Sequence, residues 1–118
     1  MNHTFLCHKN EVPTDGCKGI SLPDKENKVS DDRQVIFIVN RGDFYFAYKN
    51  SCPHTGASLN WQPDIFLDFD NFYIQCAIHA ARFEVESGLC VWGPCVNQSL
   101  QKIKLEIIDE RIYSRDSL

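Results

Sequence analysis

Four residues in two short stretches have the types and spacing of a metal site. Cys52 and His54 flank Pro53, and Cys76 and His79 repeat the pairing, which gives the order C-x-H, twenty-one residues, C-x-x-H. Proline fixes its own φ and pushes the preceding residue into an extended conformation, so the first pair lies in a stiffened bend. Two thiolates and two imidazoles satisfy either a tetrahedral zinc ion or a [2Fe-2S] cluster in which two histidines replace two cysteines on one iron.

Two other interpretations of these residues carry less weight. Zinc sites favour tighter C-x-x-C spacing than this chain has. Cys52 and His54 are also conceivable as a nucleophile and its base, but no third residue that would orient the pair is evident nearby. The residue types alone therefore favour a metal centre, but they do not decide between zinc and a [2Fe-2S] cluster.

Composition indicates one ordinary protein domain spanning residues 1–118. The chain is 43% hydrophobic and 24% charged, and its 118 residues are enough to bury a core. Its net charge is -4 and it has no cluster of Lys or Arg, which argues against nucleic acid or anionic membranes as partners. The N-terminus resembles no signal peptide and the longest apolar run, residues 35–39, is too short to span a bilayer, so we expect a cytoplasmic protein. In a reducing compartment the six cysteines indicate metal binding rather than disulfides.

The elements that must position these residues are predicted to be all-β. Apolar residues at helical spacing are not found, whereas short β-rich runs bounded by turn residues recur. The predicted strands span residues 5–12, 17–22, 34–40, 43–49, 72–75, 82–86, 89–92, 102–108 and 111–114. Residues 34–40 and 43–49 form a hairpin around Arg41-Gly42, with strands buried on both faces.

Two further strands show the alternation of a half-buried sheet. The side chains expected to point inward are Phe83 and Val85 in one strand, and Ile103, Leu105 and Ile107 in the other. Each Cys/His pair lies in a loop between two strands. Hairpins on either side could bring the two loops tip to tip, so that four ligands converge.

The stretches CPHTGASL and QCAIH, followed by Phe83, Ser87-Gly88 and Trp92-Gly93-Pro94, resemble the Rieske domain, specifically the soluble Rieske-type ferredoxins. The likeness covers roughly residues 3–115, with the specific motifs at residues 52–95. It implies a Rieske-type fold of antiparallel sheets. A smaller cluster-binding subdomain, formed by two loops within about residues 50–95, would complete that fold.

The resemblance also implies a ligand set. One [2Fe-2S] cluster would be held by Cys52 and Cys76 on one iron and by His54 and His79 on the other. The loop of Gly93 and Pro94, together with Phe83 and Trp92, would shield the cluster, and the two aromatic rings are expected in the core. The free imidazole nitrogens would face solvent, so that reduction raises their proton affinity.

The chain departs from the family pattern in three places. The second box usually reads C-P-x-H-G, but here Ala77 and Ala80 replace the proline and the glycine. We expect the second loop to differ slightly or to hold Ala80 at negative φ. The insert at residues 60–71 is either a partner-facing or a packing loop. Ala57 or its neighbours and Ile78 occupy the positions of a bracing disulfide in the proteins of cytochrome bc complexes, which predicts a potential in the lower part of about -150 to +300 mV.

The four remaining cysteines are predicted to be small buried hydrophobic residues. They are Cys7, Cys17, Cys90 and Cys95, of which the last two bracket the tryptophan-glycine-proline segment and are expected close to the cluster.

These features predict a one-electron carrier that passes electrons from a reductase to a terminal oxidoreductase such as an oxygenase. The chain is not expected to be an enzyme by itself. Outside the ligand set only His3 and His8 remain, both at the extreme N-terminus, which argues against a 2-His-1-carboxylate iron site, and no G-x-G fingerprint or P-loop is present. The alternatives are a tightly bound Rieske subunit of a nitrite reductase or dioxygenase complex, and a zinc-stabilised interaction module. A monomer would suffice for the carrier.

Overall fold

The computed structural model describes residues 4–21, 34–53, 56–60, 62–77 and 80–116. The elements in these ranges are β1 (Thr4–His8), η1 (Lys9–Glu11), β2 (Cys17–Ile20), β3 (Ile36–Arg41), β4 (Phe44–Lys49), β5 (Ile74–Gln75), β6 (Arg82–Phe83), β7 (Cys90–Trp92), β8 (Lys102–Ile103), β9 (Leu105–Ile108) and β10 (Arg111–Ser114). The single turn of 3-10 helix η1 is the only helix in these ranges, which confirms the all-β prediction. None of the described residues belongs to a helix long and apolar enough to cross a membrane.

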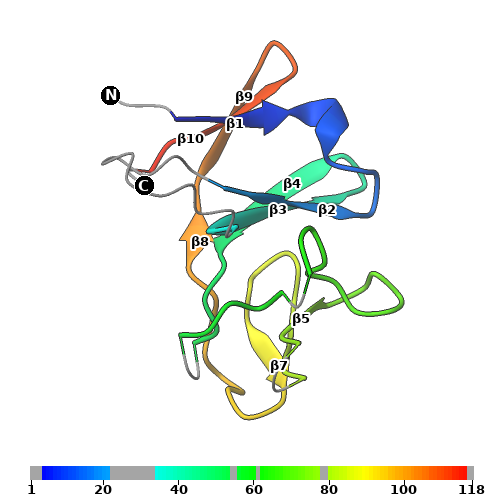
Figure 1. Ribbon diagram of the computed structural model, residues 1–118, viewed down its shortest axis with the longest axis vertical. Coiled ribbons are helices and arrows are strands. Elements are labelled where there is room, and N and C mark those ends of the chain that lie inside the picture. Colours follow the sequence, from blue (N-terminus) through cyan, green and yellow to red (C-terminus); the bar gives the residue numbers. More distant parts are fainter. Residues whose placement is uncertain (1–3, 22–33, 54–55, 61, 78–79, 117–118) are drawn as a thin grey trace.

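The strands form three antiparallel sheets. Their orders are β1-β10-β9, β2-β3-β4-β8 and β5-β6-β7. In Figure 1 the sheets follow one another from the top of the molecule to the bottom, with β5 and β7 at the lower end. The third sheet and the loops around it make the smaller subdomain that the resemblance implies.

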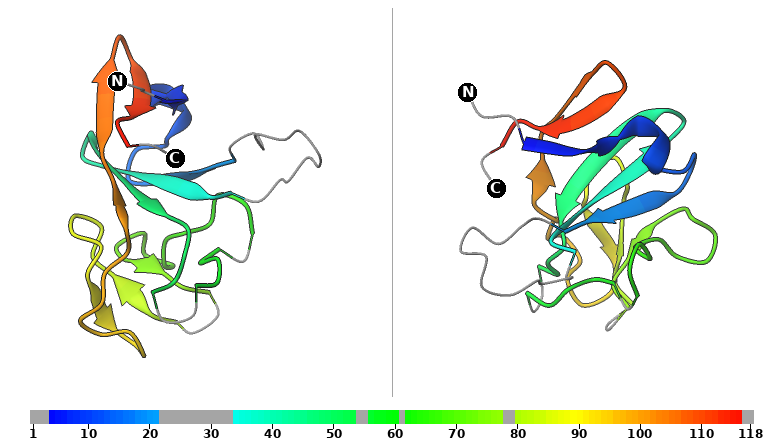
Figure 2. Two further views of the ribbon diagram at one scale, coloured as in Figure 1. Left: turned by 90° about the vertical axis from the view of Figure 1, so that its left-hand side faces the viewer. Right: turned by 45° about the horizontal axis from the view of Figure 1, so that its top comes forward.

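This subdomain is an excursion from the central sheet. β4 and β8 are neighbours in that sheet, where Ala47 pairs with Ile103 and Tyr48 pairs with Lys102. The chain between these strands leaves the sheet, builds β5, β6 and β7, and returns beside its point of departure (Figures 1 and 2). Both ligand loops therefore lie on one excursion with both ends fixed to the same sheet.

The predicted hairpin at the centre of the molecule is confirmed, with two corrections. The turn is Gly42-Asp43 rather than Arg41-Gly42, and both turn residues have positive φ, as twisted two-residue hairpins require. β3 is buried from Ile36 through Asn40, but the start of β4 is not, since Phe44 is exposed. The reason is that β8 pairs only with the far end of β4 and leaves its beginning at the sheet edge.

The predicted strand at residues 102–108 is two strands in two different sheets. It breaks at Lys104, whose amide donates to the carboxylate of Asp116, and the chain then passes from the central sheet to the first sheet. Ile103 is buried and Leu105 is partly buried against the same core, as expected. Ile107 is 42% exposed, so the inward alternation does not continue to the end of β9, which belongs to another sheet.

Two apolar cores hold the molecule together. The core beneath the ligand loops contains Phe37, Val39, Tyr48, Cys52, Leu59, Phe66, Ile74, Cys76, Ala81, Phe83, Val85, Cys90, Cys95 and Leu100. The other core, between the first and central sheets, contains Leu6, Cys7, Val12, Ile20, Ile36, Ile38, Ala47, Ile103 and Ile112. The central sheet lies between both cores, so it connects the ligand subdomain to the rest of the fold.

Tyr48 fixes the subdomain to the central sheet. Its side chain is fully buried, and its hydroxyl donates a 2.5 Å hydrogen bond to the carbonyl of Val85. A Cβ at Gly88 would lie 2.7 Å from the Tyr48 ring, so glycine is required for the turn between β6 and β7 to pass this close. The two layers are therefore joined by direct packing around one buried ring.

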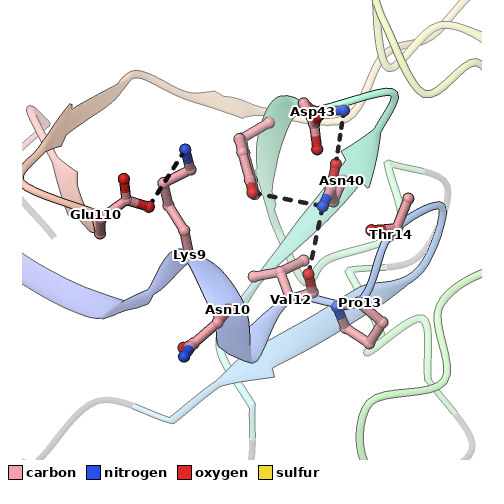
Figure 3. Close-up of a pocket in the computed structure, with 9 residues that line it drawn as sticks. Lys9, Asn10, Val12, Pro13, Thr14, Asn40, Asp43 and Glu110 are labelled. Atoms are coloured by element: carbon pink, nitrogen blue, oxygen red, sulfur yellow. Dashed lines mark hydrogen bonds and ion pairs between the residues drawn. The ribbon is translucent and has the colours of Figure 1, made fainter.

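An open, polar pocket of about 370 Å³ lies between η1, the β3–β4 hairpin and the β9–β10 turn (Figure 3). Its floor is the buried side chain of Asn40, whose amide donates to the carbonyl of Val12 and the hydroxyl of Tyr45 and whose oxygen accepts from the amide of Asp43. These bonds satisfy every polar atom of the Asn40 side chain, so the residue has a structural role. The residues that line this pocket belong to neither ligand loop.

Candidate metal centre

The two ligand loops are built on the same backbone pattern. In the first loop the amide of Cys52 donates to the carbonyl of Ala57 at 2.8 Å, and the Cys52 carbonyl accepts from the amide of Gly56 at 2.7 Å. In the second loop the amide of Cys76 donates to the carbonyl of Ala81, and its carbonyl accepts from the amide of Ala80, both at 2.9 Å. Each loop is thus a six-residue turn that begins at a cysteine and closes on itself.

The fifth residue of each turn has a left-handed backbone. Gly56 has φ of 78° and Ala80 has φ of 57°. Of the two alternatives for the second loop, a negative φ at Ala80 is therefore wrong. The left-handed backbone of the fifth residue reverses the chain, so that the carbonyl of the sixth residue, Ala81, accepts from the amide of Cys76. Alanine accepts here a conformation that glycine adopts without strain.

The two loops are bonded to each other and to the central sheet. The amide of Ala77 donates to the carbonyl of Leu59 at 2.9 Å, which joins the second loop to the end of the first. Asn50, at the base of the first loop, donates to the carbonyl of Gln34 at 2.7 Å and to the side chain of Asn60 at 2.8 Å, and it accepts from the amide of Leu59 at 2.6 Å. These hydrogen bonds fix the position of the two loops relative to each other.

Sequence reasoning assigned Asn50 no role. Its signal was available, since Asn50 directly follows a predicted strand and precedes the ligand segment. A buried amide must have hydrogen-bond partners, and this one finds them in Leu59 and Asn60 after the first ligand turn and in Gln34 before β3. Asn50 is therefore a positioning residue of the site.

The sulfur half of the ligand set fits an iron site. Cys52 and Cys76 are 1% and 0% exposed and belong to one apolar core. Two thiolates buried there would be unfavourable alone, and binding to a ferric ion would compensate their charge. His54 and His79 lie outside the described residues, so their position as ligands of the second iron stays a prediction. When bound, the cluster would be held by Cys52 and Cys76 from these two turns.

A third loop packs against the second ligand loop. Gly93 has φ of 108°, and a Cβ there would lie 2.7 Å from the Cα of Ala81. The close contact places the loop of Gly93 and Pro94 directly on the turn that begins at Cys76. Its role in shielding the cluster stays a prediction, and this contact supports it.

The two aromatic residues expected to shield the cluster lie in different environments. Phe83 is fully buried beneath the ligand loops, as expected. Trp92 is 58% exposed, so its expected place in the core is wrong. The side chain of Trp92 lies on the outer face of β7, where the guanidinium of Arg82 is 5.7 Å from its ring centroid. The pairing of β7 with β6 is irregular between Cys90 and Trp92. As a result the side chain of Cys90 faces the core, whereas that of Trp92 faces outward.

Two more cysteines approach the sulfur ligands. The thiol of Cys95 donates to the sulfur of Cys90 at 3.1 Å, and both residues lie in the same apolar core as Cys52. Burial, followed by the contacts with Cys90 and Cys52, raises the pKa of Cys95 to about 12. None of the six cysteines forms a disulfide in the structure. The expectation that Cys90 and Cys95 lie near the metal centre agrees with this arrangement, and Cys7 is buried in the other core as expected. Cys17 is only partly buried, so the expectation of a buried residue is wrong there, and its thiol donates to the carbonyl of Asp64 at 3.2 Å.

The sequence profile of the Rieske [2Fe-2S] domain matches residues 2–108. The chain belongs to this family. Of the two metal sites that the four ligand residues left open, family membership selects the [2Fe-2S] cluster. The implied fold is confirmed as well.

Known Rieske proteins resemble the chain over nearly all of its length. The biphenyl dioxygenase ferredoxin subunit of Pseudomonas sp. strain KKS102 is 29% identical over 120 residues, covering 100% of this chain and 98% of that subunit. The ferredoxin of carbazole 1,9a-dioxygenase from Nocardioides aromaticivorans has a TM-score of 0.70 at 19% identity, with 97% of each chain covered. A structure of the complex of reduced oxygenase and oxidized ferredoxin in carbazole 1,9a-dioxygenase matches with a TM-score of 0.68 at 19% identity, covering 95% of this chain and 91% of that chain.

Proposed function

We propose that the chain is a one-electron carrier that accepts electrons from a reductase and delivers them to a terminal oxidoreductase such as an oxygenase. The observation that carries this proposal is the match over 98% of a dioxygenase ferredoxin subunit. The solved complex of an oxygenase with a ferredoxin of the same fold supports a protein as the electron acceptor.

The bound cluster supplies a single reversible electron-accepting site. Two ferric ions, two sulfides and two thiolates sum to zero charge when two neutral imidazoles complete the set, whereas four thiolates would leave a charge of two negative units. Cys52 and Cys76 provide the thiolates and His54 and His79 the proposed imidazoles. This ligand choice makes the centre easier to reduce than an all-cysteine centre.

The residues around the site keep its geometry constant during transfer. The two ligand turns close on their own hydrogen bonds, and Asn50 ties the first turn to the central sheet. Burial of Cys52 and Cys76 excludes water from the sulfur side. A rigid, dry sulfur side leaves the histidine side as the proposed route for electrons to and from partners.

A stoichiometric transfer experiment tests the carrier proposal. The iron-loaded protein is reduced with dithionite, freed of excess reductant by gel filtration, and mixed anaerobically with oxidised cytochrome c. We expect one haem to be reduced per chain, at a rate that saturates with cytochrome concentration. A loaded protein that reduces no haem, or that delivers two electrons, would contradict the proposal.

The choice between a mobile carrier and a tightly bound subunit is tested separately. We expect the protein to purify free of other chains when it is expressed in its own host and isolated at physiological ionic strength. Persistent co-purification at fixed stoichiometry with an oxygenase or nitrite reductase would favour the bound-subunit alternative. A colourless protein with one zinc ion would favour the interaction module.

A further inference from the structure

Two cysteines that are not ligands meet at the third loop. The sulfur atoms of Cys90 and Cys95 are 3.1 Å apart, and the two side chains are 1% and 0% exposed. The S–S bond of a disulfide is about 2.0 Å long, so these sulfur atoms need to approach by only about 1 Å to bond. Burial of two thiols in an apolar core does not require their sulfur atoms to face each other this closely. The contact is therefore more specific than packing demands.

Hydrogen bonds of the backbone hold the two residues opposite each other. The amide of Cys90 donates to the carbonyl of Gln98 at 2.8 Å, and the amide of Asn97 donates to the carbonyl of Cys90 at 3.3 Å. The amide of Gln98 also donates to the carbonyl of Cys95 at 2.9 Å. These bonds fold residues 93–98 back onto β7. The approach of the two sulfur atoms therefore requires rotation of the side chains rather than rearrangement of the loop.

The pair lies just beneath the surface of the protein. Cys95 is buried, but its neighbours Pro94, Val96 and Asn97 are exposed. A local opening of this exposed loop would admit a small oxidant to both thiols. The closed loop would then shelter the product, and sheltered structural disulfides resist reduction by glutathione, whereas strained or exposed ones are labile.

The other cysteines do not compete for this pair. The two ligand cysteines share its core, but in the loaded protein both are committed to iron. Cys7 belongs to the other core, and the thiol of Cys17 donates to a backbone carbonyl outside this loop. In the loaded protein Cys90 and Cys95 are therefore left to react with each other.

We propose that Cys90 and Cys95 are a modification site, at which a small disulfide such as oxidised glutathione converts the two thiols into an intramolecular disulfide. One cysteine sulfur attacks the glutathione disulfide, which forms a mixed disulfide and releases one reduced glutathione. The other sulfur attacks this mixed disulfide and displaces the second glutathione. The cysteines lose two protons and two electrons, and oxidised glutathione gains both as it becomes two molecules of reduced glutathione. The second step is favoured because the fold holds the two sulfur atoms together.

The disulfide braces the third loop against the second ligand turn. It links β7 to the residue that follows Gly93 and Pro94, and Gly93 packs on Ala81 in the second turn. It replaces only two hydrogen bonds of thiols, which are weak donors. We expect the disulfide form to release iron to a chelator about threefold or more slowly than the thiol form. This inference goes beyond the proposed function, because it does not depend on electron transfer.

Peptide mapping of the wild-type protein tests the site directly. Trypsin releases residues 83–102 as one peptide that holds Cys90 and Cys95 and no other cysteine. The iron-loaded protein is equilibrated anaerobically with reduced and oxidised glutathione in about equal amounts. It is then unfolded in excess N-ethylmaleimide without a reductant and digested. We expect most of this peptide to carry no label and to be lighter by two hydrogen atoms than the dithiol form.

The same chain supplies a matched control. Cys7 and Cys17 are also close in the sequence, but they lie in separate tryptic peptides and their strands belong to different sheets. Both should carry the label in the same sample. Cys95→Ser should abolish the unlabelled peptide and leave either the label or one glutathione on Cys90. Glutathione treatment should then leave the rate of iron release from this variant unchanged.

Each outcome decides the inference. It would be overturned by a peptide that carries two labels, by a persistent mixed disulfide with glutathione, or by a bond from either cysteine to any other cysteine. Equal rates of iron release from the thiol and disulfide forms of the wild type, measured after removal of glutathione, would overturn the bracing role. A wild-type protein that binds no iron would instead contradict the proposed function, while the same peptide would still decide whether the disulfide forms.

Discussion

At the scale of single residues, Ala80 occupies the position of Gly56 in the equivalent turn. Its left-handed backbone costs an L-residue about 1 to 2 kcal/mol, while glycine gains back-bone freedom in the unfolded chain worth about 0.4 to 1 kcal/mol. We therefore expect Ala80→Gly to raise the free energy of unfolding by up to about 1 kcal/mol. Thermal unfolding of the iron-loaded variant and wild type, followed by visible absorbance, measures the difference.

The reverse substitution is the control for that prediction. A Cβ at Gly56 would meet nothing within 4 Å, so Gly56→Ala adds backbone strain and no steric clash. It should lower the unfolding temperature by an amount similar to the gain in Ala80→Gly. A destabilised Ala80→Gly variant, or a stabilised Gly56→Ala variant, would show that the two turns are not equivalent.

The buried thiol of Cys7 should make the stability of the fold depend on pH. Burial first, and the carboxylate of Glu11 second, raise the pKa of Cys7 from 9.0 to about 11. The folded state therefore favours the neutral thiol, and this contribution to stability is complete below pH 9 and lost as the pH rises from 9 to about 11. It amounts to at most about 3 kcal/mol at 1.36 kcal/mol per unit.

Urea unfolding of the iron-loaded wild type and Cys7→Ala at pH 8 and pH 10.5 measures this dependence. We expect the wild type to lose more stability than the variant over that interval. Equal losses would mean that other groups account for the alkaline sensitivity.

At the scale of elements, the loop of Gly93 and Pro94 is predicted to support the second ligand turn. Gly93→Ala would place a Cβ 2.7 Å from the Cα of Ala81, and backbone on backbone leaves no side chain to move aside. We expect the purified variant to contain less than half of the wild-type iron. Gly42→Ala is the control, because Gly42 also has positive φ but its Cβ would enter open space, and it should retain full iron content.

The base of the first ligand loop depends on one amide. Asn50→Ala removes three hydrogen bonds and leaves the amide of Leu59 without its partner. We expect a loss of about 2 to 3 kcal/mol in stability and faster release of iron to a chelator. Chelator-release kinetics at constant temperature measure the second effect. Unchanged kinetics would show that Asn50 supports the fold without positioning the loop.

The sequence predicted most of these elements, and the failures have identifiable causes. Two apolar runs around a glycine turn located the β3–β4 hairpin, because both strands stay in one sheet. Alternation failed at Ile107, where the chain changes sheets after Lys104, since period-two patterns do not reveal which sheet a strand joins. The expected core position of Trp92 was wrong because a local irregularity in pairing turns the side chain outward. Long-range pairing decides both cases.

The candidate site was predicted better than its supports. Cysteine, histidine and proline spacing is local, so Cys52 and Cys76 could be chosen from the sequence, and both lie buried at the start of matched turns. The positive φ of Ala80 could not be predicted, because the sign of φ depends on a hydrogen bond across the turn. The contacts of Asn50 could not be predicted either, since its partners Gln34, Leu59 and Asn60 lie nine to sixteen residues away in the chain.

At the scale of the whole molecule, the fold separates stability from electron transfer. The first sheet, the central sheet and their shared core stabilise one end, and the excursion between β4 and β8 carries the ligand turns at the other (Figure 1). Because both ends of the excursion are fixed to one sheet, the centre can be exposed to partners without loosening the core. Surface substitutions near the first sheet should therefore leave the midpoint potential unchanged.

The most direct test of the mixed ligand set is pulsed EPR on the dithionite-reduced protein grown with ¹⁵N-labelled histidine. We predict a paramagnetic signal from one unpaired electron per chain, coupled to two histidine nitrogens whose couplings change with the label and disappear in a His54→Ala, His79→Ala double variant. A reduced protein with no histidine nitrogen coupling, or with no signal at all, would contradict a cluster held by Cys52, Cys76, His54 and His79.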